Sequence, residues 1–486
     1  MENVTRFAPP ESLVVLSNRL PYNLPAAREG GAPRRNVGGL VNAVEPALAA
    51  RGGLWVGWDG SVLPNLAAIE TALAEPRRWT SPTGVGFVGV PISERELARF
   101  YHGFCNTALW PLFHDFIGKV RYLPEEFALY ERVNRRMAEV ALARAGPDAR
   151  IWVHDFHLML VPAILRELGF RGLINFFLHI PFPPGEIYRT LPWRDRLLAG
   201  LLAADGIAFH HERYRENFVR AAQGLAALDV VSLGEQVALV GAAGTSWASV
   251  SPIGIDVEDF ERLAGDPAVV ARARRIRAAH GGRRLLFAAD RLDYTKGIRK
   301  RLYAMERLLD LRPDLVGRVD LVTVVVPSRH QVEEYRALKR EVDREVGRIN
   351  GERGEDGWLP IHYRYRALDR RELVAHYLAA DVALVTPLRD GMNLVASEFA
   401  AARVDGDGAL VLSEFAGVSD RLPGTLLVNP YDVDGVAAAI ARALDMGEEE
   451  RRGRMAQIRR RVRSLTAVSW ADRCLSVPGT CAEGVA

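Results

Sequence analysis

The sequence predicts an α/β protein built on doubly wound parallel sheets, and three observations support this prediction. The chain has 486 residues, about three times a typical domain length, so it has room for two large domains. Short runs of Val, Ile, Leu and Phe recur and are apolar on both faces, as parallel strands between two helix layers must be. A segment with helical periodicity follows each run. Such alternation of strand and helix is typical of a doubly wound fold.

The predicted elements follow in chain order. The strands are expected at 13–16, 151–153, 173–178, 285–289, 319–326, 382–386 and 409–412. Residues 298–310 illustrate the helical pattern, because Ile298 and Leu302 fall on one face. Another helix is expected over 40–48, and the basic run 451–463 is interpreted as the solvated face of a helix.

The chain is expected to divide near its midpoint. Pro252-Ile253-Gly254 is followed by an acidic stretch, a composition typical of a surface connection. We place the hinge at 250–258, with an N-terminal domain over 1–254 and a C-terminal domain over 255–486. As an alternative, the last helix packs back on the N-terminal domain.

The composition excludes several classes of protein. With 63 Lys and Arg against 60 Asp and Glu, the net charge is only +3, so we expect no nucleic-acid partner. No window approaches the roughly 18 uncharged apolar residues that span a bilayer, and residues 1–10 lack the apolar core of a signal peptide. Cys105, Cys474 and Cys481 are too few for a disulfide framework or a zinc site. We therefore expect a cytoplasmic protein with no membrane partner.

Polar residues cluster where the predicted strands end. They stand at 154–157, at His179, and within 290–297, 327–329 and 387–393. The carboxyl ends of parallel strands meet at one edge of a sheet, where helix N-termini also point inward. Five such strand ends in one chain therefore predict a ligand site.

Arg291 and Lys296 indicate which ligand such a site suits. They bracket a loop that precedes a helix, so two cations and a helix N-terminus could share one anion. This combination suits a diphosphate and would stabilise it as a leaving group. The alternative is a structural network in which the two cations pair with Asp290 and Asp293.

Other polar positions give weaker signals. Gly38-Gly39 would let the backbone approach a phosphate or a sugar, although a simple tight turn explains the pair as well. Asp390 and Asn393 on a glycine turn suit sugar hydroxyls. Glu398, inside the next helix, suits a ribose diol or is an exposed helix charge. His179 lies between an apolar strand and a proline-rich turn and is interpreted as either functional or structural.

Two aromatic residues and several absent patterns also bear on function. Tyr101 and Trp110 suit the face of a sugar ring, although composition alone favours a core position. The chain has neither a phosphate loop nor a strand–GxGxxG–helix unit, which argues against an NTPase or a dehydrogenase. The pairs His154-Asp155 and His210-His211 lack further ligands at a suitable spacing, so we expect no metal.

Together the motifs resemble those of trehalose-6-phosphate synthases, over roughly residues 12 to 470. The matching segments are Ser17-Asn18-Arg19, Gly38-Gly39-Leu40, Trp55-Val56-Gly57-Trp58, Asn106-Thr107-Ala108-Leu109-Trp110-Pro111, His154-Asp155-Phe156-His157, His179-Ile180-Pro181-Phe182-Pro183, Asp290-Arg291-Leu292-Asp293-Tyr294-Thr295-Lys296-Gly297, Gly347-Arg348-Ile349-Asn350-Gly351, 384–398 and Val428-Asn429-Pro430-Tyr431-Asp432.

The resemblance implies a glycosyltransferase-B fold, in which two Rossmann-like domains face a central cleft. The N-terminal domain would bind the acceptor, and the C-terminal domain would bind the nucleotide sugar. Members of this family transfer glucose from a nucleotide-glucose to glucose 6-phosphate with retention of the α configuration. The products are α,α-trehalose 6-phosphate and a nucleoside diphosphate, and no metal or other cofactor is required.

The resemblance also implies roles residue by residue. Glucose 6-phosphate would be held by Arg19, Tyr101, Trp110, Asp155 and Arg329, with the two arginines on its phosphate and Trp110 shaping the pocket beside Arg329. The donor would be held by Gly38, Gly39, His179, Arg291, Lys296, Leu368, Asp390, Met392, Asn393, Leu394, Val395 and Glu398. The implied catalytic set is His179, Arg291, Lys296 and Asp155. These roles replace the core interpretation of the two aromatic residues.

Three departures from the family pattern leave part of the specificity open. Ser397 stands where many members carry lysine, Phe156 replaces a tyrosine, and Leu368 replaces a phenylalanine expected near the nucleobase. UDP-, GDP- and ADP-glucose therefore all stay possible donors. The alternatives are a retaining transferase with another polyol or cyclitol phosphate acceptor, such as a glucosylglycerol-phosphate synthase, and a non-catalytic regulatory homologue. Family members often form dimers or tetramers, so we expect a homo-oligomer.

Overall fold

The chain divides into two compact units. The computed structural model describes residues 11–24, 33–35, 39–242, 244–329 and 331–476. Unit 1 comprises Met1–Pro252 and Ala467–Ala486, and unit 2 comprises Ile253–Thr466. The first crossing of the chain from one unit to the other therefore falls within 250–258, the segment predicted to be the hinge.

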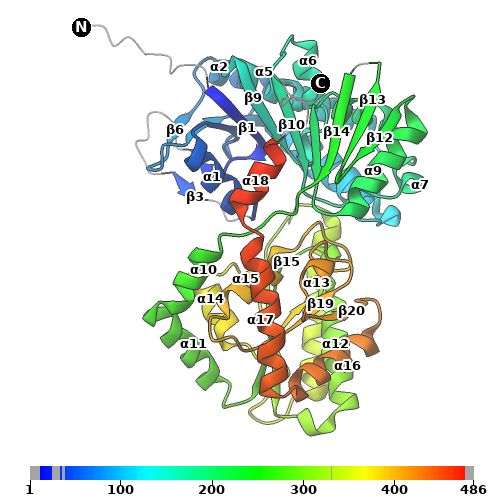
Figure 1. Cartoon of the computed structure of the whole chain (residues 1–486). Helices are drawn as coiled ribbons and strands as arrows, with labels where there is room; N and C mark the ends of the chain where they lie inside the picture. The colour runs from blue at the N-terminus through cyan, green and yellow to red at the C-terminus, as the bar shows by residue number, and fades with distance from the viewer. Residues whose placement is uncertain (1–10, 25–32, 36–38, 243, 330, 477–486) are drawn as a thin grey trace. The chain divides into compact units, whose positions relative to one another are not determined.

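Unit 1 is an α/β unit (Figure 1). Its strands are β1 (Glu11–Arg19), β2 (Tyr22–Asn23), β3 (Arg34–Arg35), β4 (Leu54–Trp58), β5 (Val62–Leu63), β6 (Arg78–Thr80), β7 (Gly86–Gly89), β8 (Ile92–Ser93), β9 (Ala145–His154), β10 (Leu173–Leu178), β11 (Gly206–Phe209), β12 (Asp229–Leu233), β13 (Gln236–Gly241) and β14 (Gly244–Val250). Its helices are α1 (Gly39–Arg51), α2 (Leu66–Ala74), α3 (Glu94–Glu96), η1 (Leu97–Leu109), α4 (Trp110–Phe113), η2 (Ile117–Lys119), α5 (Pro124–Leu142), η3 (Phe156–Leu158), α6 (Val161–Glu167), α7 (Gly185–Tyr188), α8 (Arg194–Leu202), α9 (Glu212–Leu225) and α18 (Ala467–Leu475).

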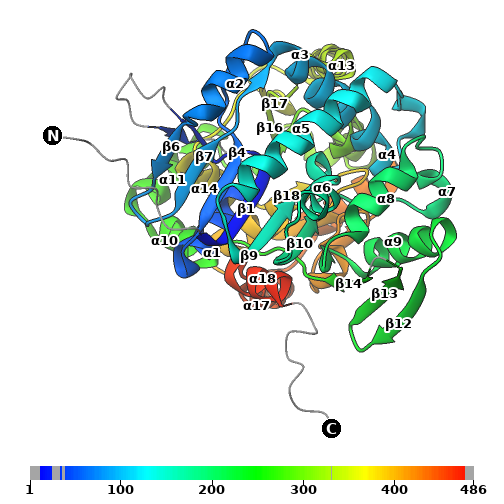
Figure 2. The same cartoon turned by 90° about the horizontal axis from the view of Figure 1, so that it is seen from above.

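The main sheet of unit 1 has ten strands in the order β12-β13-β14-β11-β10-β9-β1-β4-β7-β6. The strands from β14 to β7 are parallel. At the two ends, β12, β13 and β14 pair antiparallel, as do β6 and β7, and Figure 2 shows β12 and β13 at the outer edge. Chain order reverses between β1 and β9. Ligands of doubly wound sheets bind at such a switch point, outside the carboxyl ends of the strands.

Unit 2 is smaller and has the same architecture. Its strands are β15 (Arg284–Arg291), β16 (Val319–Val326), β17 (Ile361–Arg364), β18 (Val382–Val385), β19 (Ala409–Ser413) and β20 (Leu426–Val428). Its helices are α10 (Val257–Gly265), α11 (Pro267–Ala279), η4 (Tyr294–Lys296), α12 (Ile298–Leu311), η5 (Pro313–Leu315), α13 (Glu333–Arg353), α14 (Arg370–Ala379), α15 (Leu394–Ala402), η6 (Ser419–Arg421), α16 (Val433–Asp445) and α17 (Glu448–Ser464).

The sheet of unit 2 is wholly parallel and has the order β17-β16-β15-β18-β19-β20. Numbered along the chain this is 3-2-1-4-5-6, the order of a Rossmann sheet. The apolar face of α12 is buried in the core beside α16, and Leu302, Met305 and Leu308 are fully buried. The switch point of this sheet lies between β15 and β18.

Each predicted apolar run falls in a parallel strand, whereas other parallel strands, such as the buried β4 and β11, were not predicted. The predicted ranges 173–178 and 319–326 coincide with β10 and β16, and the predicted helix at 298–310 is α12. The antiparallel strands at the sheet edge were not predicted. They lack the signal because β12 is largely exposed and has no need of two apolar faces.

The last helix belongs to unit 1, as the alternative stated, and not to the C-terminal domain that the division at 254/255 gave it. Figures 1 and 2 show α18 beside α1. Trp470 is fully buried. Nδ2 of Asn175 donates a 2.8 Å hydrogen bond to the carbonyl of Cys474, and Arg150 donates to the carbonyl of Leu475. These bonds satisfy carbonyls that a helix C-terminus leaves without intrahelical partners.

Among the helices that the structure describes, none is both long enough and apolar enough to cross a membrane.

Candidate active site

In unit 2, most of the predicted donor residues gather at the switch point between β15 and β18. Asp290 and Arg291 end β15, and η4 and α12 follow. Asp390 to Asn393 follow β18 and lead into α15. Because β15 and β18 are neighbours in the sheet, two loops that are distant in the sequence meet at one edge.

Lys296 and Asp390 join these two loops. Nζ of Lys296 donates to Oδ2 of Asp390 at 2.6 Å, and both side chains are largely buried, 9% and 14% exposed. Asp390 also accepts from Nδ2 of Asn393 at 2.9 Å and from the backbone N–H of Gly391 at 3.0 Å. The ammonium is therefore held in a defined position by a carboxylate that is itself held on three sides.

Gly297 makes the close approach of the two loops possible. Its φ is +66°, and a Cβ atom there would lie 2.4 Å from the carbonyl oxygen of Thr386. Only glycine meets both requirements without strain or a clash. The glycine that ends the Asp290–Gly297 motif is thus needed to bring Lys296 next to the loop after β18.

The carboxylates near Lys296 have ion-pair partners beyond those that the alternative interpretation named. Asp290 pairs with Arg301 at 2.8 Å, and both side chains are buried. Asp293 pairs with Arg329 at 3.3 Å and accepts from the Tyr335 hydroxyl at 3.2 Å. Arg301 and Arg329 are therefore ion-pair partners of these two aspartates, and the charges of Lys296 and Arg291 act on them as well.

Burial and these contacts together shift the pKa values of the two aspartates in opposite directions. Burial raises the pKa of Asp290, although Arg301 and Lys296 oppose the shift. Burial also acts to raise the pKa of Asp293, but Arg329, with Arg291 and Lys296, lowers it below its ordinary value. Asp293 therefore keeps its charge and fixes Arg329.

The N-terminus of α15 lies at the same switch point. Asn393, the residue before the helix, has a φ of +69°. The first N–H groups of a helix have no intrahelical acceptor and favour an anion. Because Asn393 bonds to the same Oδ2 atom of Asp390 as Lys296 does, the helix N-terminus and the ammonium are close neighbours. Met392 is buried, and Leu394 and Val395 begin the helix half-exposed.

Glu398 lies further along α15. Its Oε2 accepts a 3.1 Å hydrogen bond from the hydroxyl of Tyr377, so it is not an exposed helix charge. Burial raises its pKa, although Tyr377 and Arg370 oppose the shift. Ser397 and Leu368, the two departures from the family pattern near the donor, are both buried.

In unit 1, two predicted acceptor residues lie at the other switch point, because Arg19 ends β1 and Asp155 follows β9. The guanidinium of Arg19, which ends β1, stacks 4.7 Å from the ring centroid of Trp58 and donates to Oδ1 of Asn23 at 3.2 Å. The ring of Trp58 lies 6.3 Å from the ring of Tyr101, which in turn lies 5.9 Å from the ring of His157. These contacts join Arg19 and Tyr101 to the loop that follows β9.

Tyr101 and Trp110 belong to an unusual helical segment. Tyr101 lies within η1, a π-helical stretch, and Trp110 begins α4 directly after it. π-Helical turns are rare and often occur at functional sites. Trp110 is buried, with its ring 4.1 Å from His114 and 5.7 Å from Phe156. Trp110 therefore occupies the core position that composition alone favoured, whereas Tyr101 is partly exposed.

Asp155 and His179 are brought together by the pairing of β9 with β10. Oδ1 of Asp155 accepts from the backbone N–H of His179 at 3.2 Å, and Oδ2 lies 3.8 Å from Nδ1 of His157. Asp155 has a φ of +75°. Among the described residues, four other than glycine have a positive φ, and three of them, Asp155, Arg329 and Asn393, are predicted site residues. Strained backbone of this kind clusters at functional sites.

Of the predicted glycine pair, the described residues include Gly39 only. Gly38 lies outside the described residues, and Gly39 is the first residue of α1. The helix expected over 40–48 is present as α1.

Three residues that contact the predicted site had been given no role in it from the sequence. Trp58 stacks on Arg19, Arg301 pairs with Asp290, and Nδ1 of His154 lies 3.0 Å from Nε2 of His179. Trp58 and His154 lie inside segments that match the family, and this match could have identified them as site residues. Arg301 gave none, because an arginine in an amphipathic helix is usually solvated.

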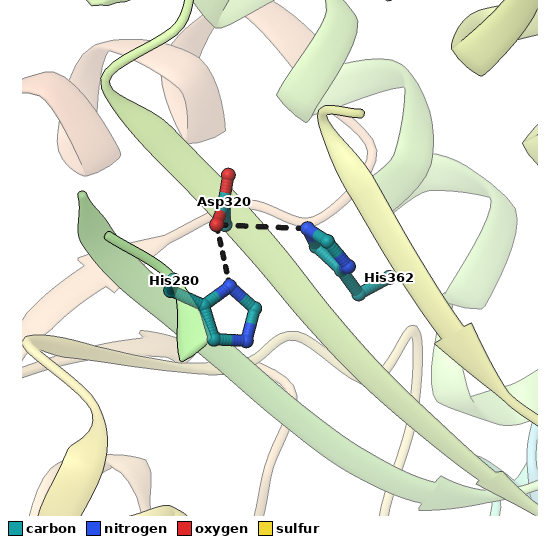
Figure 3. A group of neighbouring side chains, drawn as sticks. All are labelled: His280, Asp320 and His362. Carbon is teal, nitrogen blue, oxygen red and sulfur yellow. Dashed lines mark hydrogen bonds and ion pairs between the residues drawn. The ribbon is translucent and has the colours of Figure 1, made fainter. Parts of the chain in front are cut away.

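A second cluster of titratable groups lies at the amino edge of the sheet of unit 2 (Figure 3). His280, after α11, and His362, in β17, both point at Asp320 near the start of β16. Arg283 donates to both carboxylate oxygens, at 2.9 and 3.0 Å, and Trp358 donates to one of them at 2.9 Å. A metal ion would have to displace these donors from Asp320, so we interpret the three residues as a structural network.

Two doubly wound units with polar residues at both switch points form the architecture of glycosyltransferase-B enzymes, and this chain has that fold. The profile of glycosyltransferase family 20 matches residues 11–477. The chain belongs to glycosyltransferase family 20 and is a glycosyltransferase of the trehalose-phosphate synthase class, as its motifs indicated.

Relatives of known name share most of the chain. It is 43% identical over 473 residues to the bifunctional trehalose-6-phosphate synthase/phosphatase of Thermoproteus tenax, with 94% of this chain but only 62% of that protein covered. It is 42% identical over 478 residues to the trehalose-6-phosphate synthase of Mycolicibacterium vanbaalenii, with 94% of each chain covered. The crystal structure of an alpha,alpha-trehalose-phosphate synthase (UDP-forming) from Burkholderia xenovorans in complex with glucose-6-phosphate is similar, with a TM-score of 0.86, 34% identity, and 95% and 98% of the two chains covered.

Proposed function

We propose that this chain transfers glucose from UDP-glucose to glucose 6-phosphate with retention, forming α,α-trehalose 6-phosphate and UDP. The observation that carries the proposal is the buried Lys296 next to the N-terminus of α15 at the switch point of a Rossmann-order sheet. This arrangement suits the diphosphate of a nucleotide sugar. The UDP-forming relative that was crystallised with glucose-6-phosphate supports the choice of donor and acceptor.

On the donor side, Arg291 and Lys296 bind the diphosphate. Asp390 accepts hydrogen bonds from hydroxyls of the glucose, and the backbone of Met392 to Val395 donates to the ligand. Glu398 binds the ribose diol, for which its oxygens serve as acceptors. His179 contacts a hydroxyl of the donor glucose.

On the acceptor side, two arginines bind the phosphate of glucose 6-phosphate. Each has its guanidinium oriented by the protein before any ligand binds: Arg19 by the ring of Trp58, and Arg329 by Asp293. An arginine that is already oriented loses less conformational freedom when it forms a bidentate contact to a phosphate. Tyr101, Trp110 and Asp155 shape the site of the acceptor sugar.

The reaction needs no carboxylate nucleophile in this proposal. The acceptor hydroxyl attacks the anomeric carbon from the face that the diphosphate leaves, which forms the new C–O bond and breaks the bond from that carbon to the phosphate oxygen. The leaving phosphate oxygen takes the proton of the hydroxyl. Arg291 and Lys296 stabilise the charge that develops on the diphosphate, and such preorganised charges supply most of the rate enhancement.

The test is an assay of nucleotide and sugar products. Purified protein is incubated with glucose 6-phosphate and, separately, UDP-, GDP- and ADP-glucose, in the presence of EDTA because we propose no metal requirement. We expect UDP release that depends on the acceptor, together with a disaccharide phosphate. Release from GDP- or ADP-glucose instead would correct the donor, and release only with a polyol or cyclitol phosphate would correct the acceptor. Binding of both substrates without turnover would favour a regulatory homologue.

Arg291 gives the sharpest single-residue test of the chemistry. Replacing it with alanine removes one of the two cations on the leaving group, so kcat should fall by about 10² or more. Arg307→Ala is the matched control, because this arginine lies on α12, is 41% exposed and pairs with Asp434. Near-full turnover of Arg291→Ala would contradict the proposed mechanism.

A further inference from the structure

A second histidine lies next to His179, deeper in unit 1. His154 is the last residue of β9, and Nδ1 of its ring lies 3.0 Å from Nε2 of His179. The distance is set by the sheet, because His154 pairs with Phe177 of β10, two residues before His179. His154 is fully buried, whereas His179 is half-buried.

Aromatic rings enclose the pair on its inner side. The ring of Trp152 lies 4.4 Å from that of His154, and Phe177 lies 4.5 Å from His179. Trp470 of α18 contacts both histidines, at 6.0 and 5.9 Å. Burial lowers the pKa of His154 to about 3, and it also lowers the pKa of His179, with His154 and His210 adding to that shift. Both rings are therefore neutral near pH 7, and each has one N–H donor and one acceptor nitrogen.

The surroundings of His154 decide which nitrogen has the proton. Nε2 of His154 is buried and has no hydrogen-bond partner among the described residues. A buried N–H without an acceptor is costly, and the indole N–H groups of Trp152 and Trp470, whose rings pack on His154, are donors only. The proton of His154 therefore belongs on Nδ1, which donates it to Nε2 of His179.

This bond fixes the tautomer of His179 in turn. Because Nε2 of His179 accepts, its own proton must be on Nδ1, the nitrogen that bonds to no other described residue. We propose that His154 is a positioning residue that holds His179 in the Nδ1–H tautomer, so that His179 donates a hydrogen bond to a hydroxyl oxygen of the donor sugar. The contact with the sugar rests on the proposed function, whereas the tautomer does not.

The tautomer can be read directly from the wild-type protein. Long-range proton–nitrogen NMR spectra of protein labelled with ¹⁵N-histidine distinguish protonated from unprotonated ring nitrogens, and the signals of His179 are assigned by their loss in His179→Gln. We expect a protonated Nδ1 and an unprotonated Nε2 at pH 7.5. A protonated Nε2 in His179 would overturn the proposal, whether or not the protein transfers glucose.

Two substitutions of His154 separate positioning from packing. His154→Leu removes the donor, whereas His154→Asn keeps an N–H donor near the position of Nδ1. We expect kcat for UDP-glucose and glucose 6-phosphate to fall at least tenfold in His154→Leu, with the KM for glucose 6-phosphate unchanged, and to recover in His154→Asn. His362→Asn, a substitution on the edge strand of unit 2, should leave kcat unchanged.

The pH profile provides a readout that loss of packing alone would not move. The titratable groups around His179 are His154 from β9, Asp155 and His157 from the loop that follows, and His210 after β11. Without the N–H of His154, Nε2 of His179 can take a proton at a higher pH, so the acid limb of kcat should shift upward in His154→Leu. A folded His154→Leu variant with the wild-type kcat and pH profile would overturn the role of His154.

Discussion

Lys296 and Asp390, 94 residues apart in the chain, form a buried ion pair of 2.6 Å. They follow β15 and β18, the neighbouring strands between which the chain order of the sheet reverses. An ion pair at this point joins the two loops that a nucleotide sugar would contact in the proposed function, and it orients the ammonium before the ligand arrives.

Replacing Lys296 with alanine should strongly lower the rate of glucose transfer from UDP-glucose. The substitution removes one of the two proposed diphosphate ligands and leaves the Asp390 carboxylate buried without its cation. We expect kcat/KM for UDP-glucose to fall by about 10² or more, measured by UDP release. Lys339→Ala is the control, since Lys339 pairs with Asp343 on α13. Wild-type kcat/KM in Lys296→Ala would exclude a role on the diphosphate.

Arg329 should affect the acceptor and not the donor. Arg329→Ala removes one of the two arginines that we assign to the phosphate of glucose 6-phosphate. A charge-assisted contact of this kind is worth about 1.5–3 kcal/mol, so the KM for glucose 6-phosphate should rise by at least tenfold. The dissociation constant of UDP, measured by calorimetry, should stay the same.

The control for this experiment is Arg336→Ala. Arg336 is exposed on α13 and pairs with Glu333, so its loss should change neither constant. If Arg329→Ala weakens UDP and glucose 6-phosphate equally, the assignment of Arg329 to the acceptor is wrong.

Trp470 should contribute strongly to the stability of unit 1, although it lies near the end of the sequence. Its fully buried ring packs against Trp152, His154 and Phe177. Trp470→Ala leaves a cavity, which typically costs about 3–5 kcal/mol in the free energy of unfolding. Val468→Ala on the same helix is 44% exposed and should change that free energy by less than about 0.5 kcal/mol. Equal denaturation midpoints for the two variants would show that α18 is not docked.

Buried histidines should make the protein less stable in mild acid. Burial lowers the pKa of His154 to about 3, and burial followed by the nearby Arg364 lowers that of His376 to about 4, against about 6.5 in the unfolded chain. Between pH 6.5 and pH 4 the unfolded state therefore binds more protons, and the free energy of unfolding falls as the pH falls. Each histidine contributes up to about 1.4 kcal/mol per pH unit.

Chemical denaturation at pH 7, 6 and 5 measures this dependence. His376→Gln should flatten the decrease by its own share, because glutamine does not titrate. The Asp320 network adds a loss only in stronger acid. Although burial opposes it, bonds from His280, His362 and Arg283 lower the pKa of Asp320, so its contribution is lost as the pH falls below about 4, the pKa in the unfolded chain. A constant free energy of unfolding from pH 7 to pH 5 would contradict the assignment of neutral buried histidines.

Much of the site could be predicted from the sequence because its residues stand next to strand ends. Asp155, His179, Arg291 and Asp390 each follow an apolar run within a few residues, and parallel strands place such residues at one edge. Partners that come from other parts of the chain could not be predicted. Nothing in the run at 290–297 indicates that Lys296 pairs with Asp390, because this contact depends on β15 and β18 being neighbours.

The sequence by itself determined the fold class, the central strands and the family, because local apolar periodicity and long contiguous motifs are properties of neighbouring residues. Only the tertiary structure decided the antiparallel edge of unit 1, the return of α18 to that unit, and the contact of Trp470 and His154 with His179. The edge strands and the contact between His154 and His179 depend on which strands pair, whereas the return of α18 and the contact of Trp470 arise from packing between segments hundreds of residues apart. Such long-range contacts leave no periodic or local signal in the sequence, since they form only when the whole sheet has been assembled.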